Sequence, residues 1–125
     1  NNWDLVDLSA HHVVGGYLQN RPRDVLYELA ASPNLWDRRI AMLATFAYIK
    51  KWRFVEAFRL IRIYLRDPDD LMHKAAGWML REIGKRDAAA LRRFLEATAH
   101  RMPRTMLRYA IERFPERERR RWLTR

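Results

Sequence analysis

The spacing of the apolar residues constrains the fold of this chain more than any other feature, because it is helical along most of the sequence. In the segment SPNLWDRRIAMLATFAYIKK, apolar side chains recur at three- and four-residue intervals, which place them on one face of an α-helix. Further helical segments span residues 22–32, 54–70, 71–87, 88–102, 103–114 and 115–123. Strand-like alternation is nearly absent, so we predict an all-α protein of seven or eight helices with antiparallel neighbours.

Two residues are expected to end helices. Pro68 cannot continue the helical segment that contains it, and Gly84 is a candidate terminator of the helix that begins at Leu71. Among the tryptophans, Trp36 and Trp52 are assigned to core and inter-helix packing. Trp122 is expected to hold the last helix against the rest of the protein.

A weak internal repeat links three of these segments. The stretches that start at Leu35, Leu71 and Met102 align without gaps, and each places basic residues early in the helix before an apolar block. Their offsets are 36 and 31 residues, the length of a helix pair. This spacing predicts an α-solenoid of antiparallel helix pairs, a HEAT-like or ARM-type superhelix, in which equivalent positions line one concave face.

Length and composition are those of one folded domain. A chain of 125 residues with 49% hydrophobic residues can bury a core and does not resemble a disordered segment. It has no long apolar run and no signal-peptide pattern, so we expect a soluble, cytoplasmic protein with no membrane contact. Cysteine is absent and no two of the four histidines are spaced as a metal pair, so we expect no metal and no cofactor.

The net charge of +10 favours a polyanionic partner. Arginine accounts for 21 of the 25 cationic residues. A positive potential of this size attracts nucleic acid first and an acidic membrane surface second. The alternative is an arginine-rich surface that is simply solvated.

Two groups of residues at helical spacing form a candidate site. Trp3 and Asp7 are four residues apart, so one helical face would carry an indole and a carboxylate together. On a later helix, Trp78 follows Lys74 by four residues and precedes Arg81 by three, so these three side chains also share one face. In a stacked solenoid both groups would line one groove.

Four arginines are candidates for phosphate contacts in this groove. Arg38 and Arg39 are adjacent, so at most one of them faces the groove squarely and the other pairs with an acid or a neighbouring helix. Arg104 and Arg108 lie one turn apart on a helix that aligns with the groove-lining members of the repeat. Guanidinium groups suit this task, because their planar fork matches a phosphate.

The motifs WDLVD, LWDRRIA, HKAAGWMLRE and PRTMLRYAIE, in this order, resemble the AlkD-type DNA alkylation repair glycosylases, a family of HEAT-like repeats. The resemblance runs from Asn1 to the last helix. It implies an enzyme that excises cationic alkylated purines, such as 3-methyladenine and 7-methylguanine, from double-stranded DNA. It also implies that Asp7 is the catalytic carboxylate, Trp3 and Trp78 are groove aromatics, and Arg39 contacts the DNA backbone.

The family's chains carry further helical repeats before the tryptophan motif. We therefore interpret residues 1–125 as the C-terminal portion of a single HEAT-like repeat domain, without its N-terminal repeats, and we expect a monomer.

The chemistry of the reaction agrees with these residue types. Departure of a cationic purine leaves an oxocarbenium-like sugar, which a nearby carboxylate stabilises while aromatic faces attract the cationic base. The carboxylate can also position a water molecule for attack on the sugar. The alternative function is a non-catalytic HEAT-like module that binds nucleic acid or protein through a basic concave face.

Overall fold

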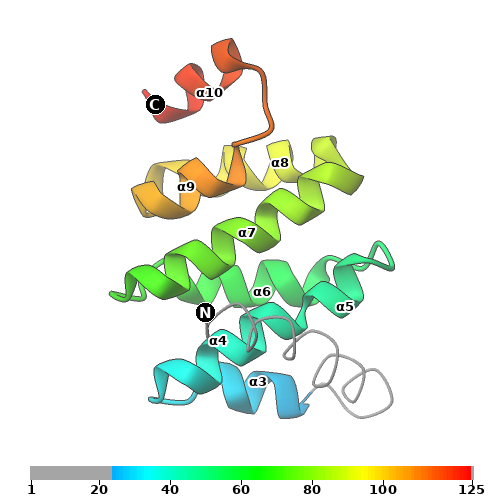
Figure 1. Ribbon diagram of the computed structural model, residues 1–125, viewed down its shortest axis with the longest axis vertical. Coiled ribbons are helices and arrows are strands. Elements are labelled where there is room, and N and C mark those ends of the chain that lie inside the picture. Colours follow the sequence, from blue (N-terminus) through cyan, green and yellow to red (C-terminus); the bar gives the residue numbers. More distant parts are fainter. Residues whose placement is uncertain (1–23, 125) are drawn as a thin grey trace, which may run out of the picture.

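The computed structural model describes residues 24–124, and all regular structure in this range is helical (Figure 1). The elements are α3 (Asp24–Ala30), α4 (Leu35–Ala44), α5 (Phe46–Ile49), α6 (Val55–Tyr64), α7 (Asp70–Arg86), α8 (Ala88–Thr98), the 3₁₀ turn η2 (Ala99–Arg101), α9 (Arg104–Ala110) and α10 (Glu116–Leu123). The predicted all-α fold is confirmed for this part of the chain.

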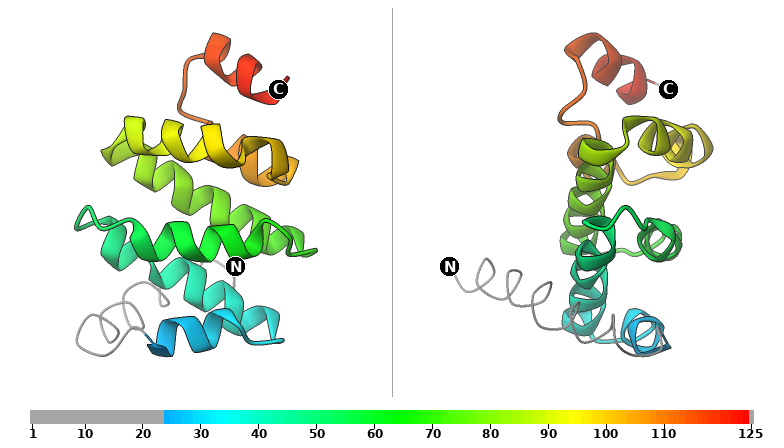
Figure 2. Two further views of the ribbon diagram at one scale, coloured as in Figure 1. Left: turned by 180° about the vertical axis from the view of Figure 1, so that it is seen from behind. Right: turned by 90° about the vertical axis from the view of Figure 1, so that its right-hand side faces the viewer.

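The helices form two layers that stack along the long axis of the molecule. Helices α4, α5, α7 and α9 make one layer, and α3, α6 and α8 make the other, as the right-hand view of Figure 2 shows. Within the first layer α7 packs against both α4 and α9. These three helices contain the three copies of the sequence repeat, so the repeat marks equivalent positions of one layer, as a solenoid requires.

Short polar connections start several of these helices. Three begin at a side chain that accepts a hydrogen bond from a backbone N–H of the first turn, which is the role of an N-cap. The pairs are Asn34 with the N–H of Trp36 in α4, Asp69 with that of Leu71 in α7, and Asp87 with that of Ala90 in α8. Because the caps lie next to tight turns, each helix reverses direction and packs on its predecessor.

The structure departs from the sequence prediction at two helix boundaries. The segment 32–51 was predicted as one helix, but it is divided at the buried Thr45, whose hydroxyl donates to the carbonyl of Met42 at 2.6 Å. This local bond competes with the helical hydrogen bonds. The regular pattern is interrupted there, since the N–H of Thr45 also donates to the carbonyl of Met42, three residues earlier. The prediction for Gly84 was also wrong, because α7 continues through it to Arg86 and Asp87 caps the next helix.

Trp52 lies in a turn rather than in the core, so its predicted packing role was wrong. Its φ is 62°, and the N–H groups of Trp52 and Arg53 donate to the carbonyls of Ile49 and Tyr48. This hydrogen-bond pattern is a Schellman motif, in which glycine usually takes the left-handed position. The Trp52 side chain is 59% exposed, and Trp36 is also 37% exposed.

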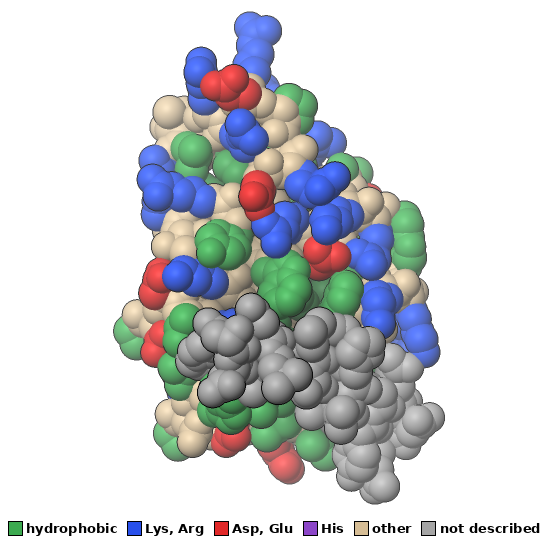
Figure 3. All heavy atoms as spheres, viewed as in Figure 1, with side chains coloured by type: hydrophobic (Ala, Val, Ile, Leu, Met, Phe, Trp, Pro, Cys, Tyr) green, Lys and Arg blue, Asp and Glu red, His purple; other side chains and the backbone are tan. Residues whose placement is uncertain are grey.

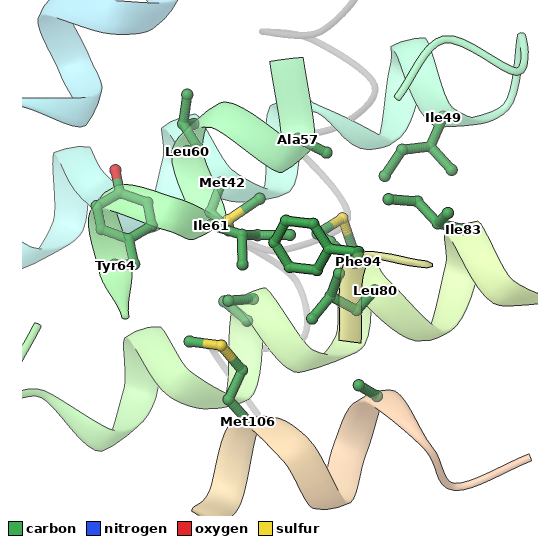
Figure 4. Packing of buried hydrophobic residues seen from close by; sticks show 14 of the residues in the cluster. Met42, Ile49, Ala57, Leu60, Ile61, Tyr64, Leu80, Ile83, Phe94 and Met106 are labelled. Carbon is green, nitrogen blue, oxygen red and sulfur yellow. The ribbon is translucent and has the colours of Figure 1, made fainter. Parts of the chain in front are cut away.

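The hydrophobic core fills the space between the layers (Figure 4). Ile49 of α5 and Ile83 of α7 point toward one another, and Phe94 of α8 lies beside Leu80 of α7. All four side chains are at most 4% exposed. Helix α7 therefore contributes to the core from the centre of the stack, while side chains on its outer face, such as Trp78 and Arg81, are not buried.

Contact between α7 and α9 is close because α7 carries a glycine there. A Cβ on Gly77 would lie 2.5 Å from the Cβ of Tyr109 and 2.7 Å from the carbonyl oxygen of Met106. Only a residue without a side chain permits this backbone separation. The close packing fixes the outer faces of the two helices next to each other.

Helix α10 is held by a polar contact and one indole. Arg92 of α8 donates from Nε and Nη2 to the two carboxylate oxygens of Glu118, at 2.9 and 3.0 Å. Glu118 also accepts from Nε1 of the buried Trp122. The prediction that Trp122 holds the last helix is confirmed.

Candidate nucleic-acid interface

One face of α7 carries a row of cations around a tryptophan. Lys74, Trp78, Arg81 and Lys85 follow each other at intervals of four, three and four residues, so they lie on one face of the helix. None of the four is buried, whereas Ala75, Ala76, Met79 and Leu80 on the opposite side belong to the core. The structure thus brings together the predicted residues Lys74, Trp78 and Arg81.

Trp78 occupies the middle of this row. It is half-buried and packs with part of its ring system against the core. An indole held in this way presents a fixed aromatic surface between cations. Such a surface suits contact with a flat or cationic group.

The neighbouring helix α9 extends the basic row into a surface. Arg81 forms an ion pair with Glu112, which follows α9 in the chain. A pocket lined by Arg81, Arg108, Tyr109 and Glu112 joins the two helices. Figure 3, drawn from the same side as Figure 1, shows Lys and Arg side chains gathered over α7 and α9 with isolated acids between them.

We call the surface formed by Lys74, Trp78, Arg81, Lys85, Arg108 and Arg113 the α7–α9 face. Its cations differ in how far acids neutralise them. The Nζ atom of Lys74 lies 3.6 Å from Oδ2 of Asp70, and that of Lys85 lies 2.9 Å from Oε2 of Glu82. Within residues 24–124, Arg108 and Arg113 have no hydrogen-bonded or ion-paired acid and are exposed. Positive charge therefore remains available for an anionic partner.

Glu82 is a buried carboxylate that pairs with Lys85 of the α7–α9 face. Burial raises the pKa of its carboxyl group, but the hydrogen bonds and charges of Lys85 and Arg86 outweigh that effect, so the net shift is downward. The carboxylate is therefore ionised at neutral pH. It holds the Lys85 ammonium at the edge of the face while leaving part of it exposed.

Arg38 and Arg39 have different surroundings from the α7–α9 face. Arg38 donates through Nε to Asp67 at 3.0 Å and through Nη1 to the carbonyls of Ser32 and Pro33. Its guanidinium is occupied by these acceptors, and we leave it out of the interface. The expectation that one of the two arginines pairs with an acid agrees with this contact, although the acid belongs to the α6–α7 connection.

Arg39 is only 8% exposed and lies between α4 and α7. Its Nη1 donates to the carbonyl of Leu71 at 2.8 Å, at the start of α7. This contact ties the two repeat helices together. The predicted contact of Arg39 with a DNA phosphate stays a prediction.

Arg104 takes part in holding α10. Its Nη1 donates to the carbonyl of Leu123, at the end of that helix. The side chain is nevertheless exposed and lies one turn from Arg108. Its predicted role in DNA binding also stays a prediction.

Trp3 and Asp7 lie outside the described residues, so their predicted roles depend on the sequence alone.

Sequence reasoning missed Lys85, Arg113 and Glu112. For Lys85 a signal existed, because it continues the spacing of Lys74, Trp78 and Arg81 by one more turn. Glu112 and Arg113 follow the end of α9, where helical periodicity no longer applies, so only the tertiary structure places them beside Arg81.

Two further properties concern residues 24–124 only. No three His, Asp or Glu side chains in this range are grouped as a metal site requires. None of the helices in it combines the length and apolar character needed to cross a bilayer.

No curated protein and no solved structure matches this chain. A family model described as "DNA alkylation repair enzyme" matches residues 1–114. This match spans the repeat helices and every residue of the α7–α9 face, Trp78 included. The chain therefore belongs to the DNA alkylation repair enzyme family.

Proposed function

We propose that the protein is a DNA glycosylase of base excision repair that hydrolyses the N-glycosidic bond of cationic alkylated purines in double-stranded DNA. The observation that carries the proposal is the row on α7, where Trp78 is half-buried between Lys74 and Arg81. Cations on both sides suit the phosphates that flank one nucleotide. The indole suits a cationic base, such as 3-methyladenine or 7-methylguanine.

The reaction needs a negative charge near the sugar. Loss of the purine leaves positive charge on the anomeric carbon, and a preset carboxylate lowers the free energy of that transition state. By the family resemblance Asp7 supplies this charge, with Trp3 on the same helical face. The cationic alkylated purine is itself a good leaving group. The residues of the chain therefore need only bind and orient the nucleotide and stabilise the charge that develops on its sugar.

The test is single-turnover release of 7-methylguanine from methylated duplex DNA. Asp7→Asn keeps the shape of the side chain but removes its charge, and we expect a rate loss of about a hundredfold, or roughly 3 kcal/mol. Affinity for the duplex should change little, because a carboxylate does not attract phosphates. Trp78→Ala should reduce the rate of base release by a smaller factor, since one cation–π contact contributes about 1–2 kcal/mol.

Asp4→Asn is the matched control. It removes the same charge three residues away, at a position where the sequence predicts the start of a helix and an acid is favoured by the helix dipole. Full excision by Asp7→Asn would overturn the catalytic assignment and leave a non-catalytic module that binds DNA through its basic face. Salt-insensitive binding, or no binding, would favour a protein-binding module instead.

A further inference from the structure

A second pocket on the α7–α9 face has the composition of an anion site. It has a volume of about 580 Å³ and is lined by Arg81, Lys85, Glu112 and Arg113. Three cations less one carboxylate give the lining a net charge of +2. The pocket is therefore positive although an acid lies within it.

Each cation of the pocket has a different relation to that acid. Arg81 is paired with Glu112, and Lys85 is paired with Glu82, which is largely buried. For Arg113 the described part of the chain offers no ion-paired acid. Arg113 can thus bind an anion without breaking an ion pair, whereas Arg81 must first lose its ion pair with Glu112.

The Arg81–Glu112 pair can be exchanged at little cost. The Glu112 side chain is 60% exposed, so it can turn toward solvent and regain its hydration. The Arg81 side chain is 23% exposed, so the pair still reaches solvent, and ion pairs at the protein surface contribute little to stability. A phosphodiester group offers the same guanidinium two anionic oxygens, which match its planar fork.

We propose that this pocket binds one phosphate of the DNA backbone, and that Glu112 is the carboxylate which this phosphate displaces from Arg81. The assignment rests on the proposed function, since it deepens the DNA contact made by the same face. Arg113 receives the phosphate, Arg81 completes the contact after the exchange, and Lys85 contributes charge. Glu112 holds Arg81 in place in the free protein and weakens binding to any DNA that does not displace it.

The experiment measures affinity for an undamaged duplex over a range of salt concentrations. Glu112→Gln should tighten binding about three- to tenfold at low salt, because phosphate no longer competes with a charged partner of Arg81. Arg113→Gln should weaken binding and reduce the slope of log affinity against log salt by about 0.9, the value of one lost phosphate contact.

Two matched controls separate the pocket from general charge. Glu116→Gln removes an acid that pairs with Arg120 on α10 and does not line the pocket. Arg117→Gln removes an exposed arginine of the same helix. Each control should change affinity much less than its counterpart in the pocket.

A double-mutant cycle tests the exchange itself. The gain in DNA affinity from Glu112→Gln should disappear in the Arg81→Ala background, because no guanidinium remains there to be freed from the Glu112 carboxylate. A gain that persists there, or one equal to that of Glu116→Gln, would overturn the proposal while the wild type still bound DNA. Failure of the wild type to bind the duplex at low salt would instead overturn the proposed function, and this inference with it.

A competition arm identifies the source of the phosphate. Vesicles that contain anionic phospholipid should not displace the duplex from the wild type. Displacement that depends on Arg113 would assign the pocket to a lipid surface and contradict the DNA assignment.

Discussion

Gly77 provides the sharpest test of how the α7–α9 face is built. It lies within α7, where the two helices approach most closely, and a Cβ would meet both the Cβ of Tyr109 and the backbone carbonyl of Met106. Neither of these atoms is the end of a flexible side chain. In Gly77→Ala, α9 must therefore move away from α7.

Two effects of opposite sign decide the stability of Gly77→Ala. In the exposed interior of a helix, alanine is more favourable than glycine by about 1 kcal/mol. Overpacking of a close contact costs about 1–3 kcal/mol, and more where backbone must shift. Because the obstructing atoms belong to a Cβ and a main-chain carbonyl, we expect the second effect to win, with a net loss of about 2 kcal/mol.

The assay is equilibrium unfolding in urea. With a slope of about 2 kcal/mol per molar urea, a loss of about 2 kcal/mol moves the midpoint down by about 1 M. Affinity for duplex DNA should also fall, because the shift separates Arg81 from Arg113, the two arginines proposed to contact one phosphate.

Gly84→Ala is the control in the same helix. Its Cβ would come within 2.5 Å of Cδ2 of Leu91, while Cβ and Cγ of that residue lie at an ordinary 3.6 Å, so a turn of the Leu91 side chain relieves the contact. The gain in helix propensity then offsets most of the cost, and the midpoint should change by less than about 0.5 M. If Gly77→Ala were as stable as wild type, or lost no more than Gly84→Ala, the close-contact argument would be refuted.

Three further predictions concern stability. Glu118→Gln weakens the ion pair with Arg92 that joins α10 to α8, and the hydrogen bond from Trp122 within α10, so it should lower stability by about 1–2 kcal/mol in thermal unfolding; an unchanged midpoint would contradict this role. Glu82 has a lowered pKa in the folded protein, so its stabilising contribution is present above the ordinary pKa of 4.5 and is lost as pH falls through the folded value. Urea unfolding should show a smaller pH dependence below pH 4.5 in Glu82→Gln than in the wild type. Trp52→Gly relieves a left-handed backbone at an exposed position and should raise stability by about 0.5–1 kcal/mol; a clear loss of stability in urea unfolding would contradict this.

Local features of the sequence were sufficient to predict most of the helices, their antiparallel order and the repeat, but not the break at Thr45 or the continuation of α7 through Gly84. Helical spacing of apolar residues and polar caps such as Asp69 act within one turn of the chain, so they can be read without knowledge of the fold. For the same reason the row of Lys74, Trp78 and Arg81 was predictable, because all three belong to α7.

Contacts between helices were decided only by the tertiary structure. The burial of Arg39 against the Leu71 carbonyl depends on how closely α4 approaches α7, and the Arg81–Glu112 pair joins residues 31 positions apart. Sequence spacing contains no information about such approaches, because they depend on the volumes of core side chains and on the absence of a side chain at Gly77. The pocket that gathers Arg81, Lys85, Glu112 and Arg113 therefore exists only because α7 and α9 pack almost backbone to backbone.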